Sequence, residues 1–229
     1  MLHVIITAAG SGSRFGAPLP KQFCLLAGRP VLMHTIESVA EAMPDANIVL
    51  TLSKDAQDLW RRLCNRYDFV SPQVVTGGDT RFHSIKNGLM SLQTKHDDII
   101  DDIIMVHDGA RPFVTYKMCQ RLIDSTLRYG SAVPTVAVTD SLRRIYPDGT
   151  NKAVDRAEYR AVETPQAFRA DILLKAYSAD YIPEFTDDAS VVEADGHSVS
   201  LVEGDPSNIK ITHPIDLAIA EAIINNKQN

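Results

Sequence analysis

The chain has 229 residues, of which 45% are hydrophobic, and its formal net charge is −6. This length and apolar content suit one domain of the larger sort with a full hydrophobic core. The negative charge disfavours non-specific binding to nucleic acid. The sequence contains no run of 18 apolar residues, so no membrane span is expected.

The first predicted strand, residues 4–7, leads into a glycine-rich loop. Three glycines lie between residues 10 and 16, accompanied by the cations Arg14 and Lys21. Glycine lets backbone N–H groups approach phosphate oxygens closely, and the cations balance phosphate charge. The segment therefore predicts a cradle for a nucleoside triphosphate. The alternative is an ordinary glycine-rich turn, although such a turn has no need of two neighbouring cations.

Two common phosphate-binding motifs do not match this loop. The third glycine, Gly16, comes one residue too late for the dinucleotide fingerprint G-x-G-x-x-G. That fingerprint also requires an acidic residue about 20 residues further on, at the end of the second strand, and the sequence shows none at a clear strand end there. The Gly-Lys-Ser/Thr of the Walker A motif is also missing. The loop thus predicts another class of nucleotide site.

Strand patterns alternate with helix patterns along most of the chain. This alternation predicts an α/β fold, a Rossmann-like three-layer αβα arrangement around a mostly parallel sheet, as a single domain over residues 1–229. The further predicted strands are residues 48–52, 74–75, 103–107 and 132–138, and the predicted helices are residues 31–43, 55–67, 81–92, 115–129 and a last one after Pro214.

Residues 139–160 interrupt the alternation. Residues 141–146 and 152–155 have the pattern of two short strands around the turn Pro147-Asp148-Gly149-Thr150. An isolated hairpin is only marginally stable, so we expect it to project as an arm and pack on a second subunit. A surface loop is the alternative.

Three cysteines, Cys24, Cys64 and Cys119, occur singly and without the C-x-x-C spacing of a zinc site. The N-terminal residues lack the basic and apolar regions of a signal peptide. We therefore expect a protein of the reducing cytoplasm with no zinc ligands.

Polar residues follow several predicted strands, where open α/β sheets bind their ligands. The glycines Gly77 and Gly78 allow close backbone approach, and Arg81 and Ser84 begin a helix whose N-terminus favours an anion or a base edge. Asp108 follows another strand, near Arg111, and either binds Mg²⁺ or a sugar hydroxyl or forms a structural salt bridge. We expect the neighbouring His107 to be a packed core residue.

Taken together, seven motifs resemble the 2-C-methyl-D-erythritol 4-phosphate cytidylyltransferases. They occur in order between residue 4 and about residue 220 and comprise Ala-Ala-Gly-Ser-Gly-Ser-Arg, Pro-Lys-Gln, Gly-Gly-Asp-Thr-Arg-Phe-His-Ser, Val-His-Asp-Gly-Ala-Arg-Pro, Thr-Pro-Gln-Ala-Phe, Thr-Asp-Asp-Ala-Ser and Asn-Ile-Lys-Ile-Thr. This family makes a CDP-alcohol from CTP and a methylerythritol phosphate and releases pyrophosphate. The reaction serves the non-mevalonate route to isoprenoid precursors.

The resemblance implies a role for each matching residue. The cytosine and ribose would be held by Ala8, Ala9, Gly78, Asp79 and Ser84. The triphosphate would be wrapped by Gly10, Ser11, Gly12, Ser13 and Arg14, and its α-phosphate neutralised by Arg14, Lys21 and Lys210. The polyol phosphate would be bound by Asp108, Arg111, Thr164 and Thr186, and from the other subunit by Ser141 and Arg156.

The resemblance also implies Mg²⁺ bridging the triphosphate and a homodimer formed through the arm. Two positions depart from the family pattern: Ser141 stands where threonine is usual, and Gly109 stands where alanine is common. Two alternatives remain, namely a ribitol 5-phosphate cytidylyltransferase, which shares the Pro-Leu-Pro-Lys-Gln run, and a nucleotide-binding regulator without catalysis. Retention of both Arg14 and Lys21 argues against the regulator.

Overall fold

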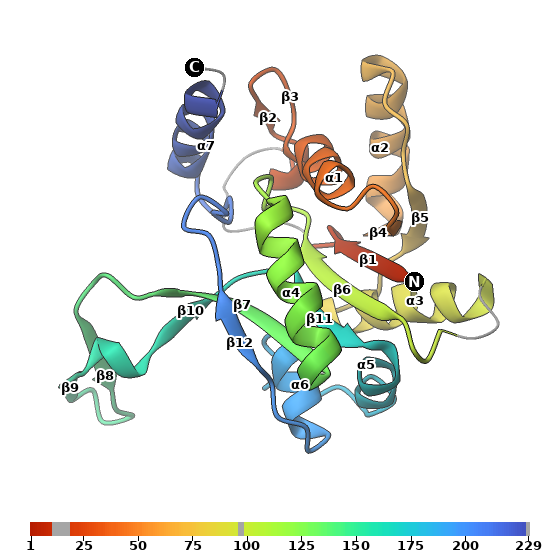
Figure 1. The fold of residues 1–229 in the computed structure, drawn as a ribbon. Helices are drawn as coiled ribbons and strands as arrows, with labels where there is room; N and C mark the ends of the chain where they lie inside the picture. Colours follow the sequence, from red (N-terminus) through yellow and green to blue (C-terminus); the bar gives the residue numbers. More distant parts are fainter. Residues whose placement is uncertain (11–18, 96–98, 228–229) are drawn as a thin grey trace.

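The computed structural model describes residues 1–10, 19–95 and 99–227. Its main sheet has the strand order β10-β7-β11-β6-β1-β4-β5, with β12 paired to β7 (Figure 1). The strands are β1 (Leu2–Thr7), β4 (Asn47–Leu52), β5 (Gln73–Thr76), β6 (Ile103–Asp108), β7 (Ser131–Ala137), β10 (Arg160–Val162), β11 (Gln166–Arg169) and β12 (Leu201–Glu203).

The half of the sheet that contains β1 is parallel. Strand β1 pairs with β4 on one side and β6 on the other, and β5 extends the sheet beyond β4. The register places Thr7 opposite both Thr51 and Asp108. The carboxyl ends of β1, β4 and β6 therefore meet at one edge of the sheet, as parallel pairing requires.

The other half of the sheet contains antiparallel pairs. Strands β10 and β11 run along the same strand, β7, and are separated by the three residues Glu163–Pro165. Strand β11 also pairs antiparallel with β6, whereas β12 pairs parallel with β7. The antiparallel strand β11 thus joins the parallel half of the sheet to β7.

Helices cover both faces of the sheet, and the alternation of side chains along β1 explains how. Val4 and Ile6 contribute to a core with α1 (Val31–Ala42), α2 (Lys54–Tyr67) and α4 (Tyr116–Tyr129). Ile5 points to the opposite core, which contains α3 (Arg81–Lys95), α5 (Ala170–Ala176) and α6 (Asp188–Ala194). Successive residues of a strand face opposite sides, so one fully buried strand serves two cores.

The structure confirms the α/β three-layer fold. The predicted strands and long helices occur close to their expected positions, and the last helix is α7 (Pro214–Lys227). The sequence analysis did not assign β11, β12 or α5, nor the two-residue strands β2 (Leu25–Leu26) and β3 (Arg29–Pro30). Within the described ranges, no helix is long and apolar enough to cross a membrane.

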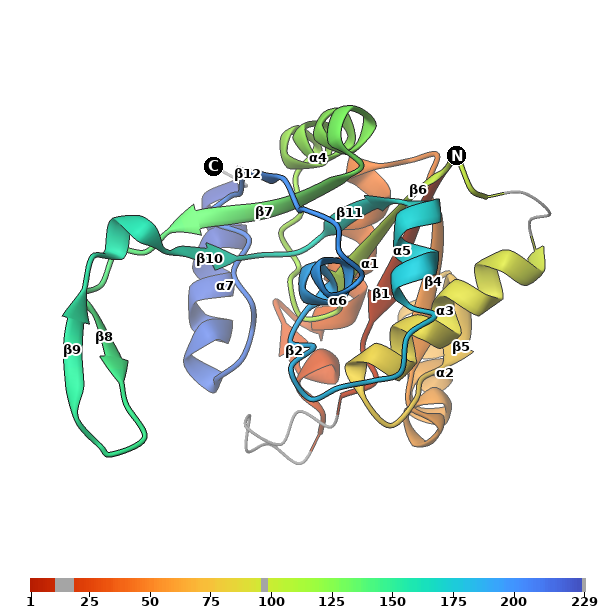
Figure 2. The same cartoon turned by 90° about the horizontal axis from the view of Figure 1, so that it is seen from below.

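Residues 139–160 contain a hairpin of β8 (Leu142–Ile145) and β9 (Asn151–Val154), followed by a short 3-10 helix, η3 (Arg156–Glu158). The two strands form a separate two-stranded sheet. In Figures 1 and 2 this hairpin lies away from the sheet and its helices. Its expected role in dimerisation remains a prediction.

Candidate active site

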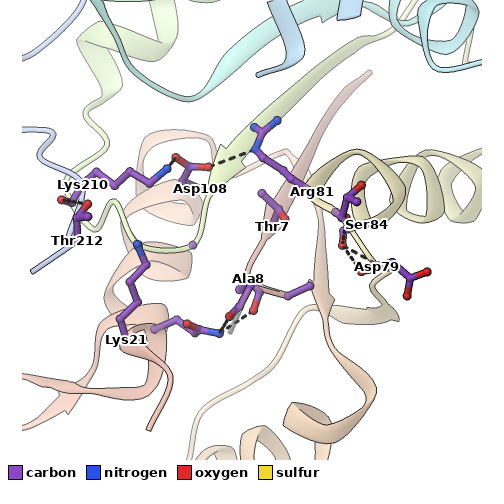
Figure 3. Close-up of a pocket in the computed structure, with 16 residues that line it drawn as sticks. Thr7, Ala8, Lys21, Asp79, Arg81, Ser84, Asp108, Lys210 and Thr212 are labelled. Carbon is purple, nitrogen blue, oxygen red and sulfur yellow. Dashed lines mark hydrogen bonds and ion pairs between the residues drawn. The ribbon is translucent and has the colours of Figure 1, made fainter. Parts of the chain in front are cut away.

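A pocket of about 360 Å³ lies at the carboxyl ends of β1 and β6. Figure 3 shows the cations Lys21, Arg81 and Lys210 and the carboxylate of Asp108 around it. Its walls come from these strand ends, the short 3-10 helix η2 (Lys21–Phe23), the start of α3 and the segment before α7. The full lining is Thr7, Ala8, Ala9, Gly10, Lys21, Gln22, Gly78, Asp79, Thr80, Arg81, Ser84, Asp108, Gly109, Ala110, Lys210 and Thr212.

The pocket brings together nine residues that the sequence analysis had assigned to a site. They are Ala8, Ala9, Gly10, Lys21, Gly78, Asp79, Ser84, Asp108 and Lys210. Four other expected residues, Ser11, Gly12, Ser13 and Arg14, lie outside the described residues. Since the assembled residues come from five separate regions of the chain, the fold unites motifs that are far apart in sequence.

Gln22 fixes the start of the glycine-rich loop, a role that the sequence analysis did not assign. Its side chain is buried, and Nε2 donates to the carbonyl oxygens of Ala8 at 2.8 Å and Gly10 at 3.2 Å. The N–H of Ala8 donates to the carbonyl of Thr51 at 3.0 Å. The only signal in the sequence was that Gln22 follows Lys21 in the Pro-Lys-Gln run.

The opposite wall is a tight turn before α3. Ser84 is buried; its hydroxyl accepts a hydrogen bond from the N–H of Gly78 at 3.1 Å and donates to the carbonyl of Thr80 at 2.9 Å. A Cβ on Gly78 would lie 2.4 Å from the Cβ of His83. Only glycine fits this position without movement of the backbone, so the turn can place its polar groups close to a ligand.

Asp108 lies among three cations. Its Oδ2 is 2.7 Å from Nζ of Lys210 and 3.6 Å from Nε of Arg111, whereas Oδ1 is 3.7 Å from Nε of Arg81. Burial by itself would raise the pKa of Asp108, but the charges of Arg81, Lys210 and Arg111 outweigh it and hold that pKa below its usual value. The carboxylate is therefore ionised and can only accept hydrogen bonds.

A buried chain of hydrogen bonds fixes the backbone beneath Asp108. The N–H of Asp108 donates to Oγ1 of Thr164 at 3.0 Å, and that hydroxyl lies 2.9 Å from Nδ1 of His107. Nε2 of His107 lies 3.0 Å from the carbonyl of Arg111. Since the carbonyl can only accept, Nε2 carries the proton and Nδ1 accepts from Thr164. Burial lowers the pKa of His107 to about 4, in agreement with a neutral core residue.

Five expected substrate-binding residues do not line the pocket. Arg111 and Thr164 are buried behind it, and Nη1 of Arg111 donates to the carbonyl of Asn208 at 2.8 Å. Thr186 is exposed, just before α6. Ser141 and Arg156 are exposed on the arm, where Arg156 donates to the carbonyl of Thr139. Their direct contact with a substrate stays a prediction.

Arg81 is a further pocket residue, which the sequence analysis placed at the start of an anion-favouring helix but not among the residues that bind CTP or the polyol. Its Nη1 and Nη2 donate to the two carboxylate oxygens of Asp188 at 3.0 Å and 2.6 Å. Burial would lower the pKa of Arg81, but the charges of Asp188 and Asp108 outweigh it and raise that pKa. The partners are 107 positions apart, so no local pattern in the sequence could reveal the pair.

The described residues contain no group of three or more His, Cys, Asp or Glu side chains that could hold a metal ion by themselves. The carboxylates that line the pocket are Asp79 and Asp108, and Asp108 already contacts Lys210. Mg²⁺ commonly uses one or two carboxylates together with substrate phosphates. The donor set thus fits an ion that arrives with a triphosphate, and it does not form an all-protein cage.

Comparison with known proteins assigns the chain to a family. Residues 2–226 match the family model of IspD, described as 2-C-methyl-D-erythritol 4-phosphate cytidylyltransferase. The chain belongs to this family. A protein of that name from Bacteroides thetaiotaomicron is 44% identical, with 96% of this chain and 98% of the relative covered. A protein of the same name from Porphyromonas gingivalis is 45% identical, with 97% of this chain and 97% of the relative covered.

Solved structures agree with this family. A 4-diphosphocytidyl-2C-methyl-D-erythritol synthase from Anaerococcus prevotii has a TM-score of 0.79 at 28% identity, with 98% of each chain covered. The 2-C-methyl-D-erythritol 4-phosphate cytidylyltransferase from Thermus thermophilus has a TM-score of 0.74 at 30% identity, with 97% of this chain and 98% of that chain covered. The family makes the chain a nucleotidyltransferase enzyme, and these matches do not favour the ribitol phosphate alternative.

Proposed function

We propose that this pocket transfers a cytidylyl group from CTP to 2-C-methyl-D-erythritol 4-phosphate and releases pyrophosphate. The observation that carries the proposal is the gathering of Lys21, Arg81 and Lys210 with Asp108 at the carboxyl ends of β1 and β6. This is the edge at which open α/β sheets bind nucleotides. Family membership supplies the identity of both substrates.

The nucleotide side of the pocket is the region of Ala8, Ala9, Gly78, Asp79 and Ser84. Hydrogen bonds within the protein fix the backbone of this region, such as those from the Gly78 N–H to Ser84 and from Gln22 to the Ala8 carbonyl. Rigid backbone donors and acceptors reject a base whose hydrogen-bonding edge is exchanged, because the wrong edge leaves buried groups unpaired. This arrangement supports selection of cytosine over uracil.

The chemistry requires charge neutralisation more than proton transfer. The substrate phosphate is already a nucleophile, so its attack on the α-phosphate of CTP needs no general base. The barrier is the approach of two anions, and the attack adds negative charge to the α-phosphate oxygens as the bond to pyrophosphate breaks. We assign Lys21 and Lys210, together with Arg14, to the stabilisation of this charge.

Mg²⁺ would be held mainly by the CTP phosphates, and Asp79 and Asp108 are the carboxylates lining the pocket that could complete its ligands. When bound, the ion neutralises triphosphate charge and orients the leaving pyrophosphate. Asp108 itself has the geometry of an acceptor for a polyol hydroxyl, since Lys210 and Arg111 occupy Oδ2 and leave Oδ1 without a hydrogen-bond donor among its described ion-pair partners.

The binding site for the polyol phosphate would be completed by residues from two chains. Ser141 and Arg156 are exposed on the arm, whose hairpin lies away from the sheet (Figure 1), and the arm also exposes the apolar residues Ile145 and Tyr159. Exposed apolar side chains on a projecting arm support packing against another copy of the chain. We therefore propose a homodimer in which each arm brings Arg156 to the partner's pocket. The three unpaired cysteines support a location in the reducing cytoplasm.

Pyrophosphate release tests the proposed function. The purified protein is incubated with Mg²⁺, CTP and either methylerythritol phosphate or ribitol 5-phosphate, and with UTP in place of CTP. We expect rapid release with CTP and methylerythritol phosphate, and release at least about a hundredfold slower with either replacement, as a site with buried hydrogen-bonding groups predicts. Equal release with ribitol phosphate or UTP would contradict the proposed specificity.

A further inference from the structure

Arg81 connects the two sides of the pocket. It is the first residue of α3, on the nucleotide side, and its guanidinium extends toward Asp108, on the side that we assign to the polyol (Figure 3). Both Nη atoms bond Asp188, while Nε faces Oδ1 of Asp108 at 3.7 Å. One guanidinium thus contacts carboxylates on β6 and on α6.

Asp188 is a fixed anchor for this guanidinium. It is fully buried at the start of α6, and its Oδ1 also accepts a hydrogen bond from the hydroxyl of Tyr177 at 2.6 Å. A bidentate pair between an arginine and a carboxylate sets the plane and direction of the guanidinium. Both Nη atoms are bonded to Asp188, and the remaining Nε edge faces Asp108.

The aromatic residues around Arg81 make the anchor rigid. The ring of Phe82 stacks on Tyr177 at a centroid distance of 4.7 Å and on Phe185 at 5.6 Å. These contacts join the start of α3 to the segment between α5 and α6. Thr186, which we assign to the polyol phosphate, lies in this segment two residues before Asp188.

The distance between Arg81 and Asp108 has a chemical consequence. Lys210 and Arg111 both approach Oδ2, so Arg81 is the described cation that faces Oδ1. At 3.7 Å it attracts the carboxylate without a hydrogen bond. The charge of Arg81 therefore orients Oδ1, and this oxygen can still accept a hydrogen bond from a hydroxyl.

We propose that Arg81 is a positioning residue for the polyol substrate: anchored by Asp188, it orients Oδ1 of Asp108 toward a substrate hydroxyl and holds the segment of Thr186 beside it. This inference rests on the proposed function, because it takes Asp108 as the acceptor for the polyol. The competing view is that Arg81 and Asp188 form a purely structural ion pair. The two views differ in what a mild substitution does to each substrate.

The main variant is Arg81→Lys, which keeps the charge but cannot bond both oxygens of Asp188 and face Asp108 at once. We expect the KM for methylerythritol phosphate to rise about tenfold, with the KM for CTP changed less than about twofold, as for loss of one oriented charged contact. In an Asp108→Asn background the same change should raise the polyol KM less than about twofold, because coupled residues are non-additive.

Two further variants complete the experiment. Tyr177→Phe keeps the ring stack and both charges but removes one hydrogen bond from Asp188, so it should shift the polyol KM in the same direction by a smaller factor. It also tests the proposal should Arg81→Lys not fold. Lys95→Gln is the matched control, since Lys95 lies in the last turn of the same helix, is exposed and does not line the pocket. It should change neither KM.

Three results would overturn the proposal: a lower melting temperature with an unchanged polyol KM, a CTP KM that rises as much as the polyol KM, or full additivity with Asp108→Asn. The first would leave Arg81 a structural residue, and the second would place it on the nucleotide. Failure of the proposed function is a separate outcome, because the unmodified protein would then release no pyrophosphate from CTP and methylerythritol phosphate.

Discussion

The negative charge of Asp108 explains how three cations gather at the end of one strand. Arg81, Arg111 and Lys210 all lie within 3.7 Å of its carboxylate oxygens, and without it they would repel one another. Lys21 lines the same pocket and lies below Lys210 in the view of Figure 3. A site prepared in this way can stabilise added phosphate charge without reorganising during the reaction.

The first prediction concerns Lys21. Lys21→Ala should lower kcat by about a hundredfold or more, roughly 3 kcal/mol of transition-state stabilisation, while CTP affinity falls far less. Steady-state pyrophosphate release and direct CTP titration measure the two quantities. Lys54→Ala, at an exposed lysine of α2 outside the pocket, is the control and should match the unmodified protein. Unchanged kcat with weakened CTP binding would contradict this role for Lys21.

The second prediction concerns His107 and the pH dependence of stability. Burial lowers its pKa in the fold to about 4 from the ordinary value of 6.5. Between these values the unfolded chain binds a proton that the folded chain does not, so the free energy of unfolding falls as pH decreases through that window. The loss by pH 4 is about 3 kcal/mol at most.

Urea denaturation between pH 7.5 and 4.5 measures this effect, with His107→Gln as the comparison. Glutamine does not titrate, so the variant should be less stable at pH 7.5 but should lose less stability on acidification. Asp108 affects a lower range, because its pKa is depressed in the fold and its stabilisation is lost only as pH falls below the ordinary value of 3.8. Parallel curves for the two proteins would show that His107 does not titrate as argued.

At the scale of elements, the strands and helices that the sequence predicted best are those long enough to show a hydrophobic pattern. Six-residue apolar strands such as β1 and β6 and the long amphipathic helices gave clear periodicity. Strand β12 has three residues and helix α5 has seven, so they offered almost no pattern. Their positions depend on tertiary contacts instead.

The site divides in the same way. Residues that directly follow strands, such as Asp108, were predicted because parallel strands end at a common edge. The pair of Arg81 with Asp188 was not predicted, because a contact across 107 positions exists only after folding. Thr164 was predicted from a motif, but its hydroxyl is used by the Asp108 backbone and His107.

The third prediction concerns the turn between α4 and β7. Gly130 ends α4 with φ of 83°, and a Cβ there would lie 2.7 Å from Cδ1 of Ile172. Gly130→Ala should lower the free energy of unfolding by about 2 kcal/mol, the sum of left-handed strain and displacement of Ile172. Gly196→Ala is the matched variant, since φ is 88° with no atom near the added Cβ.

Gly196→Ala carries the backbone strain alone, so it should cost about 1 kcal/mol. Urea denaturation of both variants checks the difference. Equal losses would mean that Ile172 moves aside without cost, and the packing part of the argument would fail.

At the scale of the whole molecule, the arm is the part that the remaining fold does not explain. Strands β8 and β9 pair with each other and not with the main sheet. Ile145 is 68% exposed and Tyr159 is 42% exposed. A hairpin of two strands gains little stability by itself, so a segment of this kind is expected to be ordered against another surface. A second copy of the chain is the surface that we propose.

The last prediction tests whether two chains form one site. If Arg156 serves the partner's pocket, Arg156→Ala should raise the KM for methylerythritol phosphate and leave CTP binding nearly intact. Chains with Arg156→Ala are then mixed with chains carrying Lys21→Ala, each almost inactive alone. In a mixed dimer with two-fold symmetry, one pocket has an intact Lys21 and receives an intact Arg156, while the other lacks both.

Each mixed dimer should therefore recover up to about half of the activity of the unmodified dimer, as two-fold symmetry requires. Differently tagged chains allow mixed dimers to be isolated, and pyrophosphate release from them gives the activity. Were Arg156 to act on its own chain, the pocket with intact Lys21 would lack Arg156 and the pocket with intact Arg156 would lack Lys21. No activity would then return, even though the mixed dimers had formed, and the arm would have to be assigned to packing alone.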